Sequence, residues 1–162
     1  MAKRTLRKTK VSIIVNLVNI FNDAFKSRTK EFRSALRPRI SSTKFKAEFG
    51  KRYTDKIVDN TTQSKTKEGS KFPDNTYSKE YAKKKGRTGP VDLLLSGDML
   101  NSLRGKISGT REITISIEGS TAPRAHGHIT GGGNLPRRDF FGLPRKDEVK
   151  IMLDTVKALA NG

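Results

Sequence analysis

Residues 111–119 read REITISIEG, and apolar and polar side chains alternate along this stretch. Its three isoleucines, Ile113, Ile115 and Ile117, are separated by single polar residues. A period of two is typical of a strand with one buried face. We expect residues 105–110 to form the partner strand of a hairpin that turns at Gly109. The stretch therefore predicts a small antiparallel sheet.

The chain before this sheet is expected to be helical. Apolar residues between Val11 and Phe25 recur at steps of three and four, which predicts one long helix over residues 6–36. Pro38 is expected to end this helix, because the residue before a proline is disfavoured in helical geometry.

A second helix is predicted after a capping site at residues 41–43. Aromatic or aliphatic side chains recur every four residues from Phe45 to Ile57, and Gly50 is expected to break or weaken the helix. Residues 59–75 are polar apart from one aromatic, which predicts a long surface loop.

Shorter elements are expected further along the chain. Ser78 is predicted to cap a short basic helix that ends at Gly86, and residues 99–103 are predicted to form another short helix. Residues 122–143 are expected to hold turns, a glycine-rich loop and at most short strand segments. A C-terminal helix is predicted for residues 147–159.

The predicted fold class is α+β, because the helical and strand periods occupy separate parts of the chain. A long N-terminal helix and further helices would pack on a small antiparallel sheet, with long loops and a C-terminal helix. The length of 162 residues suits a single domain. Its expected parts are helical residues 1–60, a polar loop over residues 61–77, and an α+β part over residues 78–162.

The chain is strongly basic. It contains 34 lysines and arginines against 16 acidic residues, a formal charge of +18. Because such a charge repels itself, a polyanion or an acidic neighbouring subunit is the expected partner. The densest cluster is Lys83, Lys84, Lys85 and Arg87. Side chains of this kind suit phosphate backbones bound without base readout, although a lysine run can also be a solvated helix face.

The composition restricts the cellular setting. The chain has no cysteine, which excludes disulfides and thiolate metal sites. An apolar run follows the basic N-terminus, but Asn16, Asn19 and Asn22 interrupt it and no cleavage site follows, so no signal peptide is predicted. No run approaches the roughly 20 apolar residues of a membrane span. We therefore expect an intracellular, soluble protein without membrane contact.

Catalytic motifs are weak in this sequence. His126 and His128 could chelate a metal, but no third ligand stands at a diagnostic spacing. Gly131 to Gly133 are not followed by the lysine and Ser or Thr of a phosphate-binding loop. No Ser-His-acid arrangement is supported by spacing. We expect no enzymatic activity, metal or cofactor; the alternative is a metal-dependent hydrolase that uses the two histidines.

The stretch NLPRRDFFGLP sets two arginines beside two phenylalanines. Pro136 fixes one backbone dihedral, and in an extended chain Arg137 and Arg138 point to opposite sides, as do Phe140 and Phe141. One arginine and one ring are then expected to anchor inward while the other pair faces out. Arginine and phenylalanine are both favoured at protein interfaces. The alternative is ordinary core filling by both rings.

Four stretches in this order resemble the virion morphogenesis proteins of tailed bacteriophages, a group of neck and tail-completion proteins. They are KFPDNTYSKEYAKKKG, VDLLLSGDMLNSLRG, ITISIEGS and APRAHGHITGGGNLPRRDFFGL. The residues that match the family pattern are Ser96, Gly97, Leu100, Leu103, His126, Leu135, Pro136, Arg138 and Phe140 to Gly142. The resemblance covers about residues 70–158. HGHITGGG replaces a tighter His-Gln-Phe-Gly in the family pattern, and Arg137 replaces a residue that is usually small.

The resemblance implies a structural protein at the virion neck, assembled in the host cytoplasm. Identical subunits would form a six- or twelve-fold ring between portal-associated or adaptor proteins and the tail, with non-specific contacts to DNA in the lumen. The predicted subunit-interface residues are His126, His128, Leu135, Pro136, Arg137, Arg138, Phe140 and Phe141. The alternative function is a general basic nucleic-acid-binding protein, associated with the ribosome or with DNA, for which the charge is the sole motive.

Overall fold

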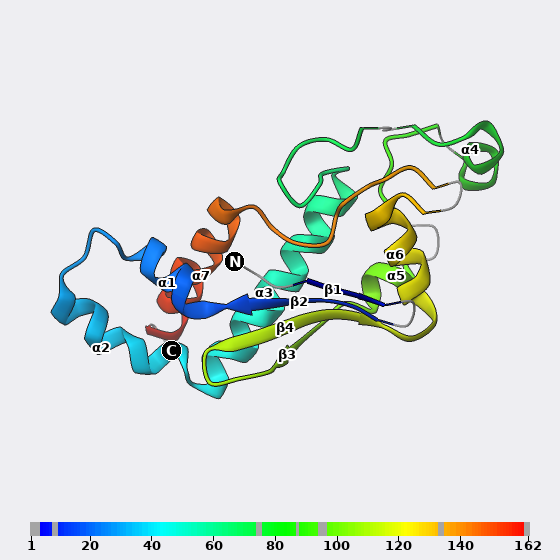
Figure 1. Ribbon diagram of the computed structural model, residues 1–162. Coiled ribbons are helices and arrows are strands. Elements are labelled where there is room, and N and C mark those ends of the chain that lie inside the picture. Colours follow the sequence, from blue (N-terminus) through cyan, green and yellow to red (C-terminus); the bar gives the residue numbers. More distant parts are fainter. Residues whose placement is uncertain are drawn as a thin grey trace.

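The computed structural model describes residues 4–7, 10–73, 76–86, 88–93, 97–132 and 135–160, with the backbone alone for residues 4–7. It confirms the α+β class: helices surround a four-stranded antiparallel sheet of order β1-β2-β4-β3 (Figure 1). The strands are β1 (Arg4–Arg7), β2 (Lys10–Asn16), β3 (Arg104–Ile107) and β4 (Glu112–Glu118). The helices are α1 (Leu17–Ala24), α2 (Lys30–Ile40), α3 (Thr43–Thr62), α4 (Lys79–Lys85), α5 (Asp98–Asn101), α6 (Ala122–Thr130) and α7 (Arg145–Ala160), with a 3₁₀ turn at Gly119–Thr121.

The hairpin predicted from REITISIEG is confirmed. Strands β3 and β4 pair antiparallel, with Lys106 opposite Thr114, and the chain reverses around Gly109. The three isoleucines of β4 are buried, as the alternation requires. The sheet is larger than expected because β2 pairs along the other edge of β4.

The prediction of a long N-terminal helix over residues 6–36 is wrong. Residues 10–16 form strand β2, in which Val11, Ile13 and Val15 are buried and lie opposite the three isoleucines of β4. The stretch VSIIV satisfies both a helical and a strand period. Its β-branched side chains favour the strand, and the matching apolar face of β4 supplies the cross-strand pairs that stabilise it.

Two shorter helices replace the rest of the predicted helix. The side chain of Asn16 caps α1 by accepting hydrogen bonds from the backbone N–H groups of Val18 and Asn19, at 3.0 and 3.2 Å. Pro38 does not end the second one, because α2 continues through it to Ile40. Ile40 is buried in the core, and we attribute the extra turn to this burial, which offsets the backbone hydrogen bond that a proline removes.

Helix α3 confirms the second predicted helix and its cap. The Ser42 hydroxyl accepts a hydrogen bond from the Phe45 N–H at 3.2 Å. The helix is not broken at Gly50, and it continues to Thr62, past the predicted start of the polar loop at residue 59. Gly50 faces Gly105 of β3, so the missing side chains allow a helix and a strand to approach closely.

The polar loop after α3 is more ordered than its composition suggests. Ser64, Thr66 and Phe72 are buried, and Thr66 and Ser70 share a hydroxyl hydrogen bond of 2.8 Å. Lys65 and Lys71 form an isolated antiparallel bridge. The described part of this loop therefore packs on the core instead of lying loosely on the surface.

The three later predicted helices are present as α4, α5 and α7, but a fourth was missed. Residues 122–143, expected to hold turns, contain helix α6. Pro123 stands in its first turn, and Gly131 ends it in the left-handed conformation with φ +74°. Pro123 and Gly131 are typical of a helix start and a helix end and can be read from the sequence. Gly127 and the glycines after it instead favoured the prediction of a loop.

Most buried side chains form one apolar cluster that extends from Val11 to Met152. Helix α3 packs on β3, β4 and α7, while α6 contacts β1, β2 and β4. Helices α2 and α4 lie at opposite ends of the molecule (Figure 1). No helix in the described part of the chain is both long and apolar enough to span a membrane.

Candidate functional site

A cavity of about 390 Å³ lies between α4, α6 and the segment 135–138. We call it the α4–α6 cavity; its described lining residues are Thr76, Tyr77, Ser78, Tyr81, Leu93, Arg124, His128, Leu135, Pro136 and Arg138. The last four of these belong to the set predicted as a subunit interface. The fold therefore brings half of that predicted set to one site.

Two glycines allow the segment 135–138 to lie against α6. The backbone N–H of Arg138 donates a hydrogen bond of 2.6 Å to the carbonyl of His128. A Cβ atom on Gly127 would lie 3.0 Å from Cδ1 of Leu135, and one on Gly131 would lie 3.0 Å from Cβ of Arg137. The two glycines thus permit close packing between α6 and the segment 135–138. Gly131 also adopts the left-handed conformation that ends α6.

The cavity is cationic. Arg124 and Arg138 line it, and none of its described lining residues is acidic. Burial, reinforced by the charges of Arg138 and Arg124, lowers the pKa of His128 to about 4. The Nδ1 atom of His128 is shielded from solvent and makes no hydrogen bond to the described residues. At neutral pH the imidazole is therefore uncharged, and it lines the same cavity as Arg124 and Arg138.

His128 is expected to make folding pH-dependent. Its pKa is about 4 in the folded chain and about 6.5 when unfolded, so the unfolded chain binds the extra proton between these values. The stabilisation is complete above pH 6.5 and is lost as the pH falls toward 4, by on the order of 3 kcal/mol. Urea unfolding of the parent and His128→Gln across this range should show a steeper loss for the parent. Parallel pH profiles would contradict the assignment.

A hydrogen-bonded group beside the cavity involves Tyr77, Lys85 and Asp92. The Tyr77 hydroxyl donates to Asp92 at 2.6 Å, and the Lys85 ammonium donates to the Tyr77 hydroxyl at 3.0 Å and forms an ion pair with Asp92. Burial alone would lower the pKa of Lys85, but the hydrogen bonds with Asp92 and Tyr77 outweigh it and raise the pKa. Asp92 is thus already neutralised.

These contacts correct the predicted phosphate-binding cluster. Lys83 and Lys84 are exposed on α4, as a phosphate contact requires. Lys85 has a side chain only 10% exposed and is engaged with Asp92, so its prediction as a DNA contact is wrong. Arg87 lies outside the described residues.

The arginine pair divides as predicted, but the phenylalanine pair does not. Arg138 is buried while the side chain of Arg137 is 70% exposed. Phe140 and Phe141 are each 1% exposed and meet edge to face, with ring centroids 6.2 Å apart. The prediction that one ring faces outward is wrong. The Phe140 N–H donates to the Arg138 carbonyl at 2.9 Å, a local turn that breaks the alternation of an extended chain.

The two histidines do not act together. They are two residues apart on α6, and side chains at this spacing point to different sides of a helix. Within the described ranges, no group of three or more His, Asp or Glu side chains is arranged to hold a metal ion. His126 does not line the α4–α6 cavity.

A basic segment at the far end of the molecule was not singled out from the sequence. Residues 26–39, which we call the basic arm, carry six cations against one acid, Glu31. The arm contains α2 and exposes Phe32 to 44%, with the Arg28 guanidinium 5.8 Å from its ring centroid. A count of charge along the chain identifies this segment, whereas the predicted helix over residues 6–36 was defined by its apolar positions.

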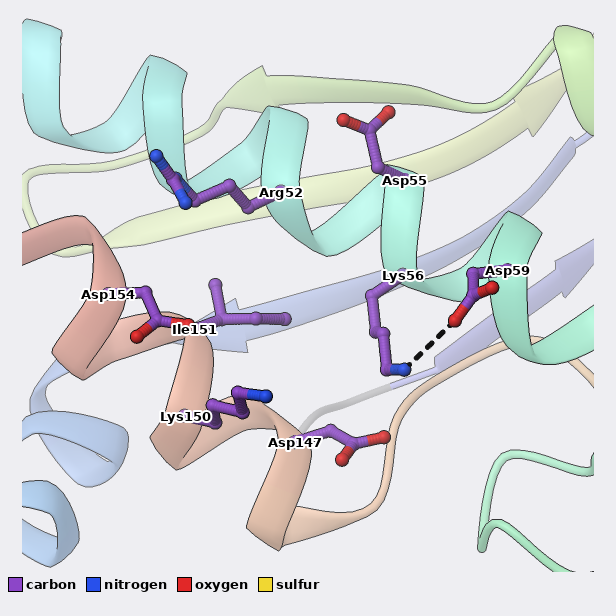
Figure 2. Close-up of a pocket in the computed structure, with 8 residues that line it drawn as sticks. All are labelled: Arg52, Asp55, Lys56, Asp59, Asp147, Lys150, Ile151 and Asp154. Carbon is purple, nitrogen blue, oxygen red and sulfur yellow. Dashed lines mark hydrogen bonds and ion pairs between the residues drawn. The ribbon is translucent and has the colours of Figure 1, made fainter. Parts of the chain in front are cut away.

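A second hollow of about 330 Å³ lies between α3 and α7 (Figure 2). Its lining residues are Arg52, Asp55, Lys56, Asp59, Asp147, Lys150, Ile151 and Asp154. Lys56 reaches from α3 toward α7 and pairs with Asp59 at 3.0 Å. The hydrogen bond from Lys56 lowers the pKa of Asp59. We call this hollow the α3–α7 groove; it gathers four of the 16 acidic residues of a very basic chain.

Comparison of the chain with protein families, with curated proteins and with solved structures finds no significant match. Function is therefore argued from the motifs and from the geometry of the site.

Proposed function

We propose that this chain is a structural virion protein of a tailed bacteriophage, forming a ring at the neck that joins the DNA-filled head to the tail. The proposal rests on the four ordered motifs and on the way their residues meet in the fold. Its predicted partners are further copies of the same chain, in six- or twelve-fold rings, and the adjoining portal-associated and tail proteins.

The observation that carries the proposal is the association of the motif segments around α6. Strand β4 from the third motif leads directly into α6 through the 3₁₀ turn. The second motif contains α5, which contacts α6, and Ser102 and Thr121 share a hydroxyl hydrogen bond of 2.8 Å. The last motif returns to α6 through the Arg138–His128 backbone bond. Three motifs within residues 91–143 thus meet around α6, and Leu135 and Arg137 are exposed beside it.

A ring also needs two different surfaces that complement each other, because its contacts are heterologous. The α3–α7 groove carries four aspartates against three cations, Arg52, Lys56 and Lys150, so its lining has a small excess of negative charge. The basic arm and the exposed lysines of α4 are cationic. Charge complementarity between such patches guides association and fixes register. We expect the groove of one subunit to receive a basic surface of the next.

Charge reversal in the groove should therefore prevent assembly. The assembled parent is expected to have the mass of six or twelve copies by native mass spectrometry. Asp55→Lys combined with Asp154→Lys should shift this mass to the monomer, because like charges would then face each other. Glu68→Lys reverses the charge of an exposed carboxylate away from the groove, the basic arm and α4, and should leave the mass unchanged.

The neck assignment itself is tested in virions. Purified particles of the phage that encodes the chain should contain stoichiometric copies of it, and averaged images of the neck should show its ring. Virions that lack the chain, together with normal head–tail joining after its deletion, would overturn the proposal.

The basic arm favours one alternative, a general nucleic-acid-binding protein. In that case the isolated monomer should bind free duplex DNA tightly, and affinity should fall steeply as salt rises. Lys30→Gln with Arg39→Gln should reduce the slope of log affinity against log salt by about 1.8, if each residue neutralises one phosphate. Lys146→Gln with Lys157→Gln removes the same charge from exposed sites on α7 and should leave the slope unchanged. Weak monomer binding would count against this alternative.

A further inference from the structure

The α4–α6 cavity has an apolar part and a polar part. The rings of Tyr77 and Tyr81 pack against each other with centroids 4.9 Å apart and an angle of 42° between their planes. Leu93, Leu135 and Pro136 complete the apolar lining. Aromatic and aliphatic walls of this kind are typical of small-molecule sites, and about 390 Å³ lies within their usual range of about 300–1,000 Å³.

The polar part consists of Arg124, Arg138 and His128. The side chain of Arg124 makes no hydrogen bond or salt bridge to the described residues, although it lines the cavity. Arg138 is 6% exposed, and a guanidinium has five N–H donors with which to serve several acceptors. His128 has its shielded, unbonded Nδ1 atom in the same region.

The described lining of this cavity contains two arginines and no carboxylate. Asp92, the carboxylate that bonds to Tyr77, is already paired with Lys85. Two arginines beside an apolar wall attract an anion more strongly than they would in open solvent, because partial burial reduces screening. Arginine also fits the paired oxygens of a carboxylate or phosphate better than lysine does.

We propose that the α4–α6 cavity binds an oxyanion, a carboxylate or a phosphate, that is joined to a planar apolar group. Arg124 and Arg138 hold the oxyanion, and the tyrosine pair with Leu135 covers the apolar group. This inference goes beyond the proposed neck function and does not depend on ring formation, because all of its residues belong to one chain.

The two histidines of the chain provide a clean measurement. Ring signals of His126 and His128 are followed by NMR at pH 7 while benzoate, phenyl phosphate or neutral benzamide is added to the full chain. Both anions should shift the His128 signal saturably and leave the His126 signal in place, and benzamide should bind at least about tenfold more weakly because it lacks the charge. The tighter of the two anions identifies the carboxylate or the phosphate as the natural group.

Matched variants distinguish the cavity from general charge effects. Arg124→Gln should weaken binding by about tenfold or more, whereas Arg137→Gln removes the same charge outside the cavity and should bind as the parent does. Arg124 is exposed, so its substitution should leave the fold intact, which a thermal melt checks. The inference is overturned by an absent His128 shift, by equal binding of benzamide, or by equal affinities in the two variants.

Discussion

Phe140→Ala is expected to lower the free energy of unfolding by about 3–5 kcal/mol. The Phe140 ring is 1% exposed, meets Phe141 edge to face and belongs to the main apolar cluster. Its removal would leave a cavity that the backbone cannot close, because Lys67 holds the neighbouring Asp139 through both its backbone N–H and its ammonium group. Urea denaturation, read as a shift in midpoint at constant slope, measures the loss.

This expectation replaces the prediction that Phe140 is a subunit-interface residue, whose loss would impair assembly more than monomer folding. Arg137→Ala is the matched control, since its exposed side chain should change stability by no more than about 0.5 kcal/mol. A Phe140→Ala chain that unfolds at the same urea concentration as the Arg137→Ala chain would show that the ring is not part of the core. Assembly is better tested at Leu135, which is 39% exposed.

Gly105→Ala is expected to destabilise the fold by about 1–3 kcal/mol through overpacking. A Cβ atom at this position of β3 would lie 3.2 Å from three backbone atoms of Gly50 in α3. Backbone atoms of a helix cannot move aside as a flexible side chain can, so helix and strand would have to separate. Thermal or urea unfolding measures the effect.

An alanine on the other side of this contact, at Gly50 in α3, should have the opposite effect on stability. A Cβ atom on Gly50 would meet nothing nearer than 3.7 Å, which is an ordinary contact. Gly50→Ala should therefore stabilise α3 by about 0.5–1 kcal/mol, because alanine is the better helix former. Equal effects of the two substitutions would mean that α3 and β3 are not packed as closely as the structure has them.

Local signals predicted several elements correctly. The alternation in β4 identified the hairpin, and the hydroxyls of Ser42 and Ser78 cap helices where expected. Gly86 ends α4 in the left-handed conformation, as its position suggested. Each of these signals depends on neighbours within a few residues, so no tertiary information was needed.

The predictions that proved wrong concern residues whose conformation or contacts depend on distant parts of the chain. Residues 11–15 suit a helix or a strand, and pairing with β4, which lies about 100 residues away, selects the strand. The glycines at 127 and 131 suggested a loop, yet they serve a close approach by Leu135 and Arg137. In the sequence, Lys85 cannot be distinguished from Lys83 and Lys84. In the fold it forms an ion pair with Asp92, whereas those two lysines are exposed.

The candidate site was predicted in part. His128, Leu135, Pro136 and Arg138 were named from the sequence, but as members of a subunit interface. Their common cavity also depends on Tyr77, Tyr81 and Arg124. These residues come from the segment before α4, from α4 and from α6, which nothing in the local sequence connects. The basic arm at the other end of the molecule was not named as a site, although its charge can be counted in the sequence.

The α+β class, the large positive charge, the start of α3, both ends of α4 and the β3–β4 hairpin follow from the sequence. Periodicity and capping act over a few residues, so these elements need no distant contact. Only the tertiary structure shows that residues 10–16 form a strand and that Phe140 and Phe141 are both buried. It also shows that Lys85 forms an ion pair with Asp92 and that a cavity lies between α4 and α6. These features depend on contacts between distant segments, whose free energy outweighs local preference once the core forms.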